Sequence, residues 1–346
     1  MIDNTYKASG VDISAANEMK ASFSPFLERS GTTLNRRNAF AAIFDANLSA
    51  YRDPVLVFKS EEPGSKQLLA LERDRVESVC TDMINHLVND CIVCGATPVA
   101  IQDVIVCGKL DPSLVKRAVK AMAQAAAAHG CFLSGGETSE QPGVLGDGVY
   151  VLSSSIIGVV ERDGILDGST IEPGDVVLAL RSSGIHTNGY SLVRHLISRH
   201  PELLNTLVDG RPFGEVILDV HRSYLGCLKP LFERSLVKGA AHITGGGIGE
   251  NLNRILPDSV DALISLQSYK PNPIFQLLRE VSGLHDQELL RTFNLGVGMA
   301  IVVAEENLLE VSGILDQFEM ECWPIGRTQH GTGVVRYDGT IPWGSK

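Results

Sequence analysis

Glycine-rich segments follow four predicted strands, and each could bind an anion. They lie at residues 63–66, 135–138, 182–189 and 244–247. Glycine lets backbone amides converge at positive φ without the penalty of about 1–2 kcal/mol that a side chain brings. The last two segments also open predicted helices, whose first N–H groups are unpaired and carry the positive end of the helix dipole. Neither GxxxxGK[ST] nor GxGxxG occurs, so the pattern indicates phosphate handling without a P-loop or dinucleotide fingerprint.

Acidic residues form the second chemical set. Glu61 and Glu62 directly precede the first glycine-rich segment, and Asp103 lies in the middle of an apolar strand, where a carboxylate is costly unless paired or liganded. Asp82 and Asp90 lie on one predicted helix, about 2.2 turns apart and therefore near the same face. Oxygen ligands of this kind suit Mg²⁺ that bridges nucleotide phosphates. For Asp82, a solvated helix face is an equally good interpretation.

His186 and Asn188 lie in the third glycine-rich segment, SSGIHTNG. A histidine in a polar, glycine-bounded loop is less typical of a core position, and its ordinary pKa suits proton transfer near neutral pH. Asn188 has two compatible interpretations. Its side chain can cap the helix that follows, or it can bind a ligand.

The elements that must position these residues alternate between strands and helices. Strands are predicted over 53–58, 98–106, 131–134, 149–160, 176–180, 240–243, 260–265 and 297–303. Helices are predicted over 77–95, 111–129, 189–198, 219–236, 248–256, 273–281 and 285–291. In the second of these helices, Asp111 is the expected N-cap and Pro112 the first helical residue. The pattern predicts an α/β chain with two domains, residues 1–168 and 169–346.

Length and composition agree with two globular domains. A chain of 346 residues allows about two domains, and 44% hydrophobic with 21% charged residues excludes a disordered chain. The formal net charge of −11 argues against a general nucleic-acid binder. No apolar run approaches the ~20 residues of a membrane span, and the N-terminus lacks a signal-peptide core. The seven cysteines include one CxxC pair, Cys91 and Cys94, without a second pair, so we expect free thiols in a reducing, cytoplasmic compartment.

Longer motifs carry a family resemblance across nearly the whole chain. They are YKASGVDISAAN (6–17), LVND (87–90), GATP (95–98), GKLD (108–111), GGETSEQPG (135–143), SSGIHTNGYSLVR (182–194), HITGGGIGENLNRILP (242–257) and RTFNLGVGM (291–299). In these motifs and their order the chain resembles the aminoimidazole ribonucleotide synthetase family, also called phosphoribosylformylglycinamidine cyclo-ligases. GGETxExPG together with SSGxHxNGYSLVR is a highly specific combination.

The resemblance implies an enzyme of purine biosynthesis. Such enzymes use ATP and Mg²⁺ to phosphorylate the formyl amide oxygen of formylglycinamidine ribonucleotide. An internal amine then closes the ring, and phosphate leaves as aminoimidazole ribonucleotide forms. The resemblance further implies a cytoplasmic homodimer in which the N-terminal, ATP-side domains of two subunits pair into a shared β-barrel, with mixed sheets in each α/β domain. It implies no nucleic-acid or membrane partner.

The acidic and glycine-rich sets, taken together with the resemblance, suggest a role for each candidate residue. The implied catalytic residues are His186, Glu137 and Asn188. The implied substrate-binding residues are Asp103, Thr138, Ser183, Gly184, Thr244, Gly245 and Gly246. ATP would be bound by Gly64, Ser65, Lys66 and Asn89, and the metal by Glu61, Asp82 and Asp90.

Residues 35–66 depart from the family pattern. A glycine-rich GGLGGFGA stretch is NRRNAFAA here (35–42), so Asn38, Ala39 and Ala41 replace glycines. The family's GTDGVGTK becomes KSEEPGSK (59–66), which places Glu61 where a metal-binding Asp is expected and adds Lys59, beside the new cations Arg36 and Arg37. These changes leave two alternatives: a paralogue that binds a ribonucleotide without turning it over, and an ATP-dependent relative with another substrate.

Overall fold

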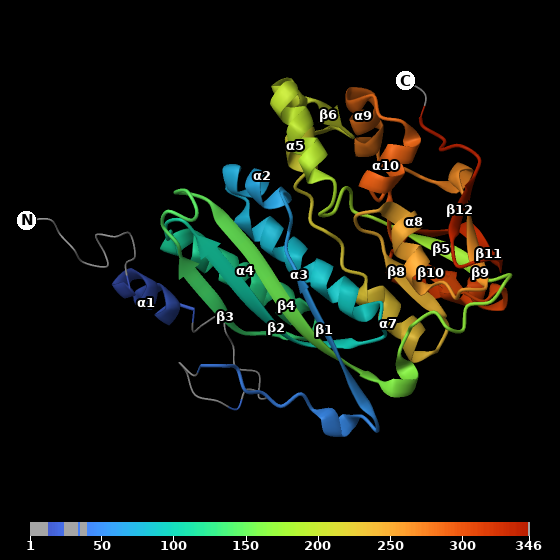
Figure 1. Cartoon of the computed structure of the whole chain (residues 1–346), viewed down its shortest axis with the longest axis horizontal. Coiled ribbons are helices and arrows are strands. Elements are labelled where there is room, and N and C mark those ends of the chain that lie inside the picture. The colour runs from blue at the N-terminus through green and yellow to red at the C-terminus, as the bar shows by residue number, and fades with distance from the viewer. Residues whose placement is uncertain (1–12, 24–33, 35–39, 345–346) are drawn as a thin grey trace, which may run out of the picture. The chain divides into compact units, whose positions relative to one another are not determined.

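Two compact units, each built around a mixed β-sheet, make up the described chain (Figure 1). The computed structural model describes residues 13–23, 34 and 40–344. The first unit contains the described residues up to Pro63, then Ala70–Cys91 and Ala96–Asp163. The second contains Gly64–Leu69, Ile92–Gly95 and the described residues from Gly164 onward. The altered segment at residues 35–39 lies outside the described residues.

The first unit has a four-stranded sheet in the order β1-β4-β2-β3. Its strands are β1 (Pro54–Glu61), β2 (Thr97–Cys107), β3 (Phe132–Glu140) and β4 (Tyr150–Glu161). The β2–β3 ladder is parallel, whereas β4 pairs antiparallel with both β1 and β2. The helices are α1 (Ile13–Ala21), α3 (Val76–Ile92) and α4 (Pro112–Ala128), and α2 (Lys66–Glu72) begins among the residues of the second unit. The predicted strands 53–58, 98–106 and 149–160 are confirmed.

Helices α3 and α4 pack on one face of this sheet. Gly158 of β4 leaves room for the Cys91 sulfur of α3, and Ser154 of the same strand contacts the sulfur of Met122 in α4. Side chains two residues apart point to the same side of a strand, so both helices cover one face. The predicted N-cap of α4 is confirmed, because the Asp111 carboxylate accepts hydrogen bonds from the amides of Ser113 and Leu114.

The opposite face of the first sheet carries exposed apolar side chains. Leu56 and Phe58 of β1 are 60% and 70% exposed, and Val104 of β2 and Val151 of β4 are also exposed. The strand register places all of them on this face, because Phe58 pairs with Ile157 and Val104 with Ser153. We refer to Leu56, Phe58, Val104 and Val151 as the open-face patch.

The second unit contains a six-stranded sheet in the order β12-β9-β11-β5-β10-β8. Its strands are β5 (Val176–Arg181), β8 (Gly239–His242), β9 (Val260–Ser265), β10 (Val297–Val303), β11 (Cys322–His330) and β12 (Val335–Asp338). The β9–β12 ladder is parallel and the others are antiparallel. Every residue of β10 is buried, as its continuous apolar run predicts.

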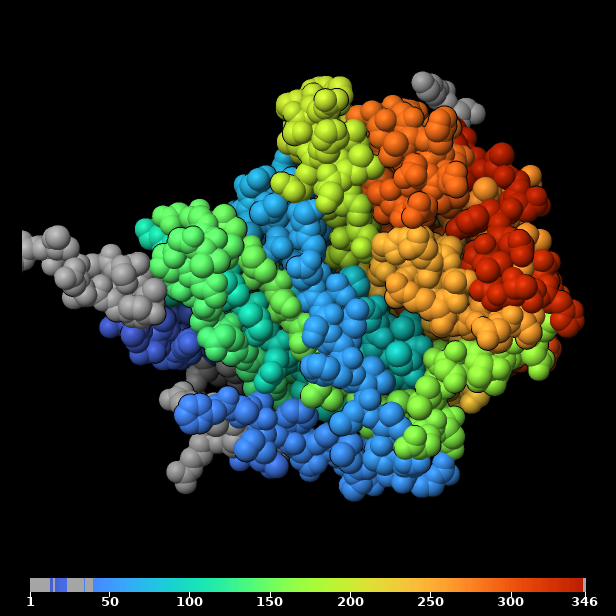
Figure 2. Space-filling view, viewed as in Figure 1, coloured from blue at the N-terminus to red at the C-terminus, as the bar shows by residue number. Residues whose placement is uncertain are grey.

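Helices and a small hairpin complete the second unit. The helices are α5 (Tyr190–Arg199), α6 (Phe213–Val216), α7 (Leu225–Glu233), α8 (Gly247–Leu252), α9 (Pro273–Ser282), α10 (Asp286–Thr292) and α11 (Leu308–Gln317), and the hairpin is β6 (Leu207–Val208) with β7 (Arg211–Pro212). Figure 2 shows the atoms of α8, α9 and α10, in orange, forming a continuous surface on the face in view. The helices predicted at 273–281 and 285–291 are confirmed by α9 and α10.

Three predictions about local structure are wrong. Residues 135–138 are not a loop: they belong to β3 and pair with β2. The helix expected over 219–236 begins only at Leu225, and residues 219–224 form an irregular segment. The helix expected over 77–95 ends at Ile92, so Cys94 lies beyond it. The seven cysteines, all among the described residues, are free thiols, as expected.

None of the helices in the described part of the chain has the length and apolar character needed to cross a bilayer.

Candidate functional site

The predicted site residues divide between the two units. The first unit holds Glu61, Asp82, Asn89, Asp90, Asp103, Glu137 and Thr138. The second holds Gly64, Ser65, Lys66, Ser183, Gly184, His186, Asn188, Thr244, Gly245 and Gly246.

A lysine joins two of the predicted metal ligands in the first unit. The Lys59 Nζ atom lies 3.0 Å from Glu61 Oε2 and 3.2 Å from Asp90 Oδ2. His86, one turn before Asp90 on α3, places its Nε2 atom 3.8 Å from the same Glu61 oxygen and 3.6 Å from the same Asp90 oxygen. Burial by itself lowers the pKa of Lys59, but the hydrogen bond to Glu61 and the charge of Asp90 outweigh it and raise that pKa. We call Lys59, Glu61, His86 and Asp90 the Lys59 cluster.

Asp82 and Asn89, also predicted from the sequence, are fully buried on α3. Asp82 precedes Asp90 by eight residues, a rise of about 12 Å along the helix. That distance is too great for the two carboxylates to share one ion. The fold therefore places Asp90 beside Glu61 but leaves Asp82 too far from Asp90 to bind the same ion.

Asp103 is a buried carboxyl group on the helix-covered face of the sheet. It is 4% exposed, and burial, opposed by a hydrogen bond to its own backbone and reinforced by the charge of Glu137, raises its pKa to about 7. Gly136, its partner on β3, has no side chain because a Cβ there would overlap the Asp103 carboxylate. The glycine pair at 135–136 thus allows β2 and β3 to pack closely where their pairing shifts register, and it does not form a loop. A carboxyl group that titrates near neutral pH is a feature of functional sites.

Glu137 and Thr138 lie on opposite faces of β3. Glu137 pairs with Val104, on the side of the open-face patch, and Thr138 pairs with Ile105, on the side that carries Asp103. Only Thr138 therefore shares a face with Asp103.

His186 is held rigidly in the second unit. Its backbone adopts a left-handed conformation with φ of 65°, which is uncommon for a residue with a side chain. Its ring is buried, and Nε2 accepts a hydrogen bond of 3.2 Å from the Ser183 amide. The ring stacks on that of His221, with centroids 3.9 Å apart. The Ser183 hydroxyl donates to the Val220 carbonyl, so this side chain orders the loop.

Lys66 is fully buried and fastens the same loop. Its Nζ atom donates to the carbonyl oxygens of His186, at 3.1 Å, and Asp219, at 2.8 Å. The ammonium also lies 5.5 Å from the centre of the Tyr190 ring. Gly64, in the turn just before α2, has φ of 61° and lies close to the Thr187 carbonyl. Lys66 and Gly64 thus lie against the loop that carries His186.

Asn188 is not a helix cap. The cap of α5 is Gly189, at φ of 83°, and no side chain bonds the first amides. The Nδ2 atom of Asn188 is buried and has no hydrogen-bond partner among the residues that the structure describes. Its Oδ1 atom lies 3.4 Å from the Cβ position that a side chain at Gly245 would occupy. The 182–189 and 244–247 segments are therefore adjacent, and Asn188 offers an amide donor there.

Two buried asparagines that sequence reasoning did not single out hold these loops in place. Asn294 accepts a hydrogen bond from Ser182 and donates to the carbonyls of Gly184 and Ile185. Asn251 contacts the Thr244 hydroxyl and donates to the carbonyls of Gly245 and Gly247. Both lie within the quoted motifs RTFNLGVGM and HITGGGIGENLNRILP, which is the signal that could have identified them.

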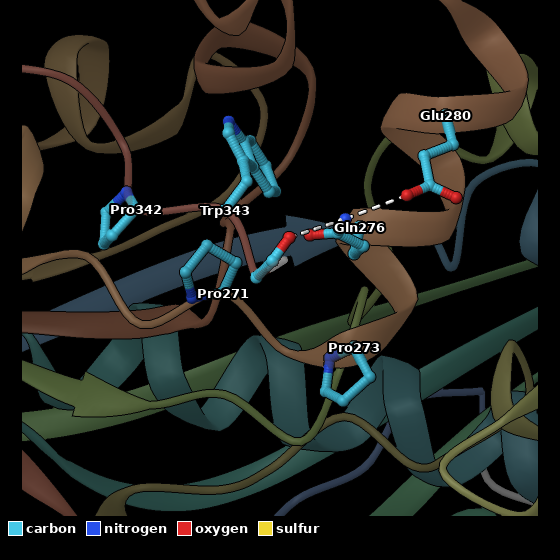
Figure 3. A pocket seen from close by; sticks show the side chains of 7 residues that line it. Pro271, Pro273, Gln276, Glu280, Pro342 and Trp343 are labelled. Carbon is cyan, nitrogen blue, oxygen red and sulfur yellow. Dashed lines mark hydrogen bonds between the residues drawn. The ribbon is translucent and has the colours of Figure 1, made fainter. Parts of the chain in front are cut away.

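A separate cavity of about 370 Å³ lies beside α9. Figure 3 shows its lining, with Pro271, Pro342 and Trp343 around Gln276, whose amide donates to Glu280 and to the Gly344 carbonyl. None of the predicted site residues is among the residues that line it.

Sequence comparisons match both halves of the chain. Residues 45–160 match AIR synthase related protein, N-terminal domain, and residues 172–339 match AIR synthase related protein, C-terminal domain. The phosphoribosylformylglycinamidine cyclo-ligase of Bacillus cereus (strain G9842) is 38% identical over 345 residues, covering 97% of this chain and 99% of the relative. That of Bacillus mycoides (strain KBAB4) is 37% identical over 345 residues, with the same coverage.

Solved structures show the same fold at low identity. Thiamine-monophosphate kinase from Stenotrophomonas maltophilia K279a has a TM-score of 0.69 at 18% identity, covering 96% of this chain and 98% of the other. The hydrogenase maturation protein HypE in complex with ATP has a TM-score of 0.68 at 18% identity, covering 95% and 92%.

Proposed function

Because the chain belongs to the AIR synthase related protein family, we propose that it is an ATP-dependent cyclo-ligase of purine biosynthesis. Its reaction converts formylglycinamidine ribonucleotide to aminoimidazole ribonucleotide. The observation that carries this proposal is 38% identity with a cyclo-ligase over 97% of the chain. ATP phosphorylates the formyl amide oxygen, the internal amine attacks the activated carbon, and phosphate leaves as the ring closes.

Within the second unit, the ordered loops supply groups for the formyl amide. Asn188 has a buried amide donor with no partner in the described part of the chain, and it suits the oxygen whose charge grows during phosphoryl transfer. His186 is fixed by Ser183, His221 and Lys66, and it is our candidate for moving the proton of the attacking amine. Thr244, Gly245 and Gly246, with Ser183 and Gly184, form the ribonucleotide-binding loops. Lys66, with Gly64 and Ser65, is assigned to the ATP side.

Within the first unit, Asp103 is assigned to substrate binding. Its raised pKa lets the carboxyl group hold a proton near neutral pH, so it can donate a hydrogen bond to a ligand. Thr138 shares its face of the sheet. Glu137 and Asn89 keep their assignments to catalysis and ATP binding from family resemblance.

The Lys59 cluster fits a cation that accompanies ATP. The Lys59 ammonium group lies within 3.2 Å of carboxylate oxygens of both Glu61 and Asp90. The two carboxylates therefore converge on one positive charge, as a metal site requires. We assign Mg²⁺ to these two oxygens. Asp82, which lies too far along α3 to share this ion, keeps its assignment to metal binding from the sequence pattern alone. Bound Mg²⁺ would neutralise phosphate charge. Because Lys59 contacts the same oxygens, it must give them up when the ion binds.

The open-face patch supports a homodimer. Exposed apolar side chains gathered on one sheet face mark an interaction surface, and Leu56, Phe58, Val104 and Val151 lie on one face of the first unit. We propose that two first units pair through this face in a cytoplasmic homodimer, with residues 1–168 as the ATP-side domain and residues 169–346 as the second domain.

One observation favours a second candidate function. Lys59 neutralises Glu61 and Asp90 from within the chain, which would suit a paralogue that binds a ribonucleotide without turning it over.

ADP release by the purified protein separates the two functions. With ATP and Mg²⁺, the cyclo-ligase releases ADP only when formylglycinamidine ribonucleotide is present, and aminoimidazole ribonucleotide appears. A folded protein whose melting temperature rises with the ribonucleotide, but which releases no ADP, would establish the paralogue instead.

A further inference from the structure

Three buried histidines from separate segments meet in the second unit. His186 lies in the 182–189 loop, His221 in the irregular segment 219–224, and His242 at the end of β8. Their exposed fractions are 2%, 0% and 5%. One potential ligand atom from each lies within 4.8 Å of the others. The proposed reaction uses His186 alone, so the convergence of all three has no part in it.

The closest contact joins two ring nitrogens. The Nε2 atoms of His221 and His242 lie 2.9 Å apart. Two lone pairs at this distance repel each other unless a proton or a metal ion lies between them. Two imidazoles bound to one Zn²⁺ at 2.0–2.1 Å would have nitrogens roughly 3.3 Å apart, so a small opening of this pair is sufficient.

A hydroxyl group orients the central ring. The Nδ1 atom of His221 lies 3.3 Å from the Thr187 hydroxyl oxygen. When that hydroxyl accepts the Nδ1 proton, the His221 Nε2 lone pair faces His242. Metal-binding histidines are commonly fixed by such a hydrogen bond from the second ring nitrogen. His186 stacks on the same ring. Because its Nε2 atom accepts the Ser183 amide proton, His186 must release that hydrogen bond, or lose its Nδ1 proton, to bind an ion.

We propose that His186, His221 and His242 form a binding site for a divalent transition-metal ion, with Zn²⁺ as the preferred ion. Three imidazole ligands and one open position are typical of zinc sites. Nitrogen donors favour Zn²⁺, Co²⁺ or Ni²⁺ over Mg²⁺, whereas the carboxylates of the Lys59 cluster favour Mg²⁺. Because three neutral imidazoles leave the double positive charge of the ion uncompensated, the open position favours an anion such as hydroxide or a phosphate oxygen.

Titration with Co²⁺ tests the site directly. The full-length protein, without a histidine tag and treated with a chelator, is titrated with Co²⁺ in the absence of ATP and ribonucleotide. We expect about one ion per chain, with the visible absorption of four-coordinate Co²⁺, displaced by Zn²⁺ but not by excess Mg²⁺. Absence of stoichiometric binding by the wild-type protein would overturn the proposal, whatever the outcome of the ADP assay.

Variants and spectroscopy locate the ion. Thr187→Val removes only the orienting hydroxyl and should weaken Co²⁺ binding about tenfold, whereas His221→Gln should weaken it at least a hundredfold. The matched control His200→Gln changes an exposed histidine and should leave the affinity unchanged. If a buried variant fails to fold, X-ray absorption of the Zn²⁺-loaded wild-type protein still decides: three imidazole ligands support the site, and fewer than three contradict it.

Discussion

Replacing Asp103 with asparagine is expected to stabilise the protein above neutral pH. Burial raises the pKa of Asp103 from 3.8 to about 7, and a difference of roughly three pH units corresponds to about 4 kcal/mol. The residue is 4% exposed, so solvent screening reduces this figure little. Asparagine keeps the size of the side chain and removes the titrating proton.

The sign follows from which state binds the proton. Below pH 3.8 both the folded and the unfolded chain hold it, and the carboxyl group makes no pH-dependent contribution to the free energy of unfolding. Between pH 3.8 and about 7 the unfolded chain ionises while the folded chain keeps the proton, so the free energy of unfolding falls as pH rises. Above pH 7 the loss levels off. The Asp103→Asn variant lacks this loss. Its free energy of unfolding, relative to that of the wild type, should therefore be about 2–3 kcal/mol higher at pH 8 than at pH 5.

Hydrogen exchange of β2 is the suitable assay. Both tryptophans, Trp323 and Trp343, lie in the second unit, so their fluorescence does not report on Asp103. The exchange rates of β2 peptides are measured at pH 5 and pH 8 and corrected for the intrinsic exchange rates. Wild type and Asp103→Asn are compared, and Asp147→Asn, which changes an exposed residue of the same unit, is the control. An advantage that is equal at both pH values, or a variant less stable at pH 8, would refute the reasoning.

Three further substitutions test the site. Lys59→Met should tighten Mn²⁺ binding in the absence of ATP roughly fivefold, because it removes a competing ammonium worth about 1 kcal/mol. Electron paramagnetic resonance titrations measure this affinity, with Lys59→Arg as the charge-retaining control. An unchanged affinity would show that Lys59 does not compete with the ion for Glu61 and Asp90. Lys66→Met removes two charge-assisted hydrogen bonds and should lower the free energy of unfolding by about 2–4 kcal/mol, followed by tryptophan fluorescence in urea. His186→Asn, which tolerates the left-handed backbone, should lower turnover at least about 100-fold with little change in melting temperature; wild-type turnover would remove His186 from the chemistry.

The regular elements were predictable where one signal dominates. Helix α4 has Asp111 and Pro112 at its start and an alanine-rich body, and β10 is a continuous apolar run, so both are confirmed. Strand β11 escaped prediction because Pro324 and Gly326 interrupt it. Its pairing with β5 shifts register between these two residues, a tertiary arrangement that local propensity does not encode.

Glycine misled the prediction of local structure at residues 135–138. Two adjacent glycines indicate a turn in isolation, but here Gly136 accommodates the Asp103 carboxylate from the neighbouring strand. That requirement comes from a residue 33 positions earlier and is visible only once the strands are paired. The buried Asp103 itself was predictable, since a carboxylate inside an apolar strand is unusual whatever its partner.

The side-chain clusters show what sequence patterns cannot supply. The sequence predicted metal ligands at Glu61 and Asp90 and showed Lys59 as a new cation, but the ion pairs that join the three depend on β1 lying against α3. His221 was expected within a helix and instead lies in an irregular segment against His242. Neither contact has a periodic signature along the chain.

Isotope transfer from the substrate tests the cyclo-ligase function most directly. The purified protein is incubated with ATP, Mg²⁺ and formylglycinamidine ribonucleotide carrying ¹⁸O in the formyl group, and the phosphate and ribonucleotide products are analysed by mass spectrometry. Phosphorylation of the formyl oxygen predicts that one ¹⁸O-labelled phosphate is released for each aminoimidazole ribonucleotide formed. Unlabelled phosphate, or the absence of the cyclised product from folded protein that binds the substrate, would contradict it.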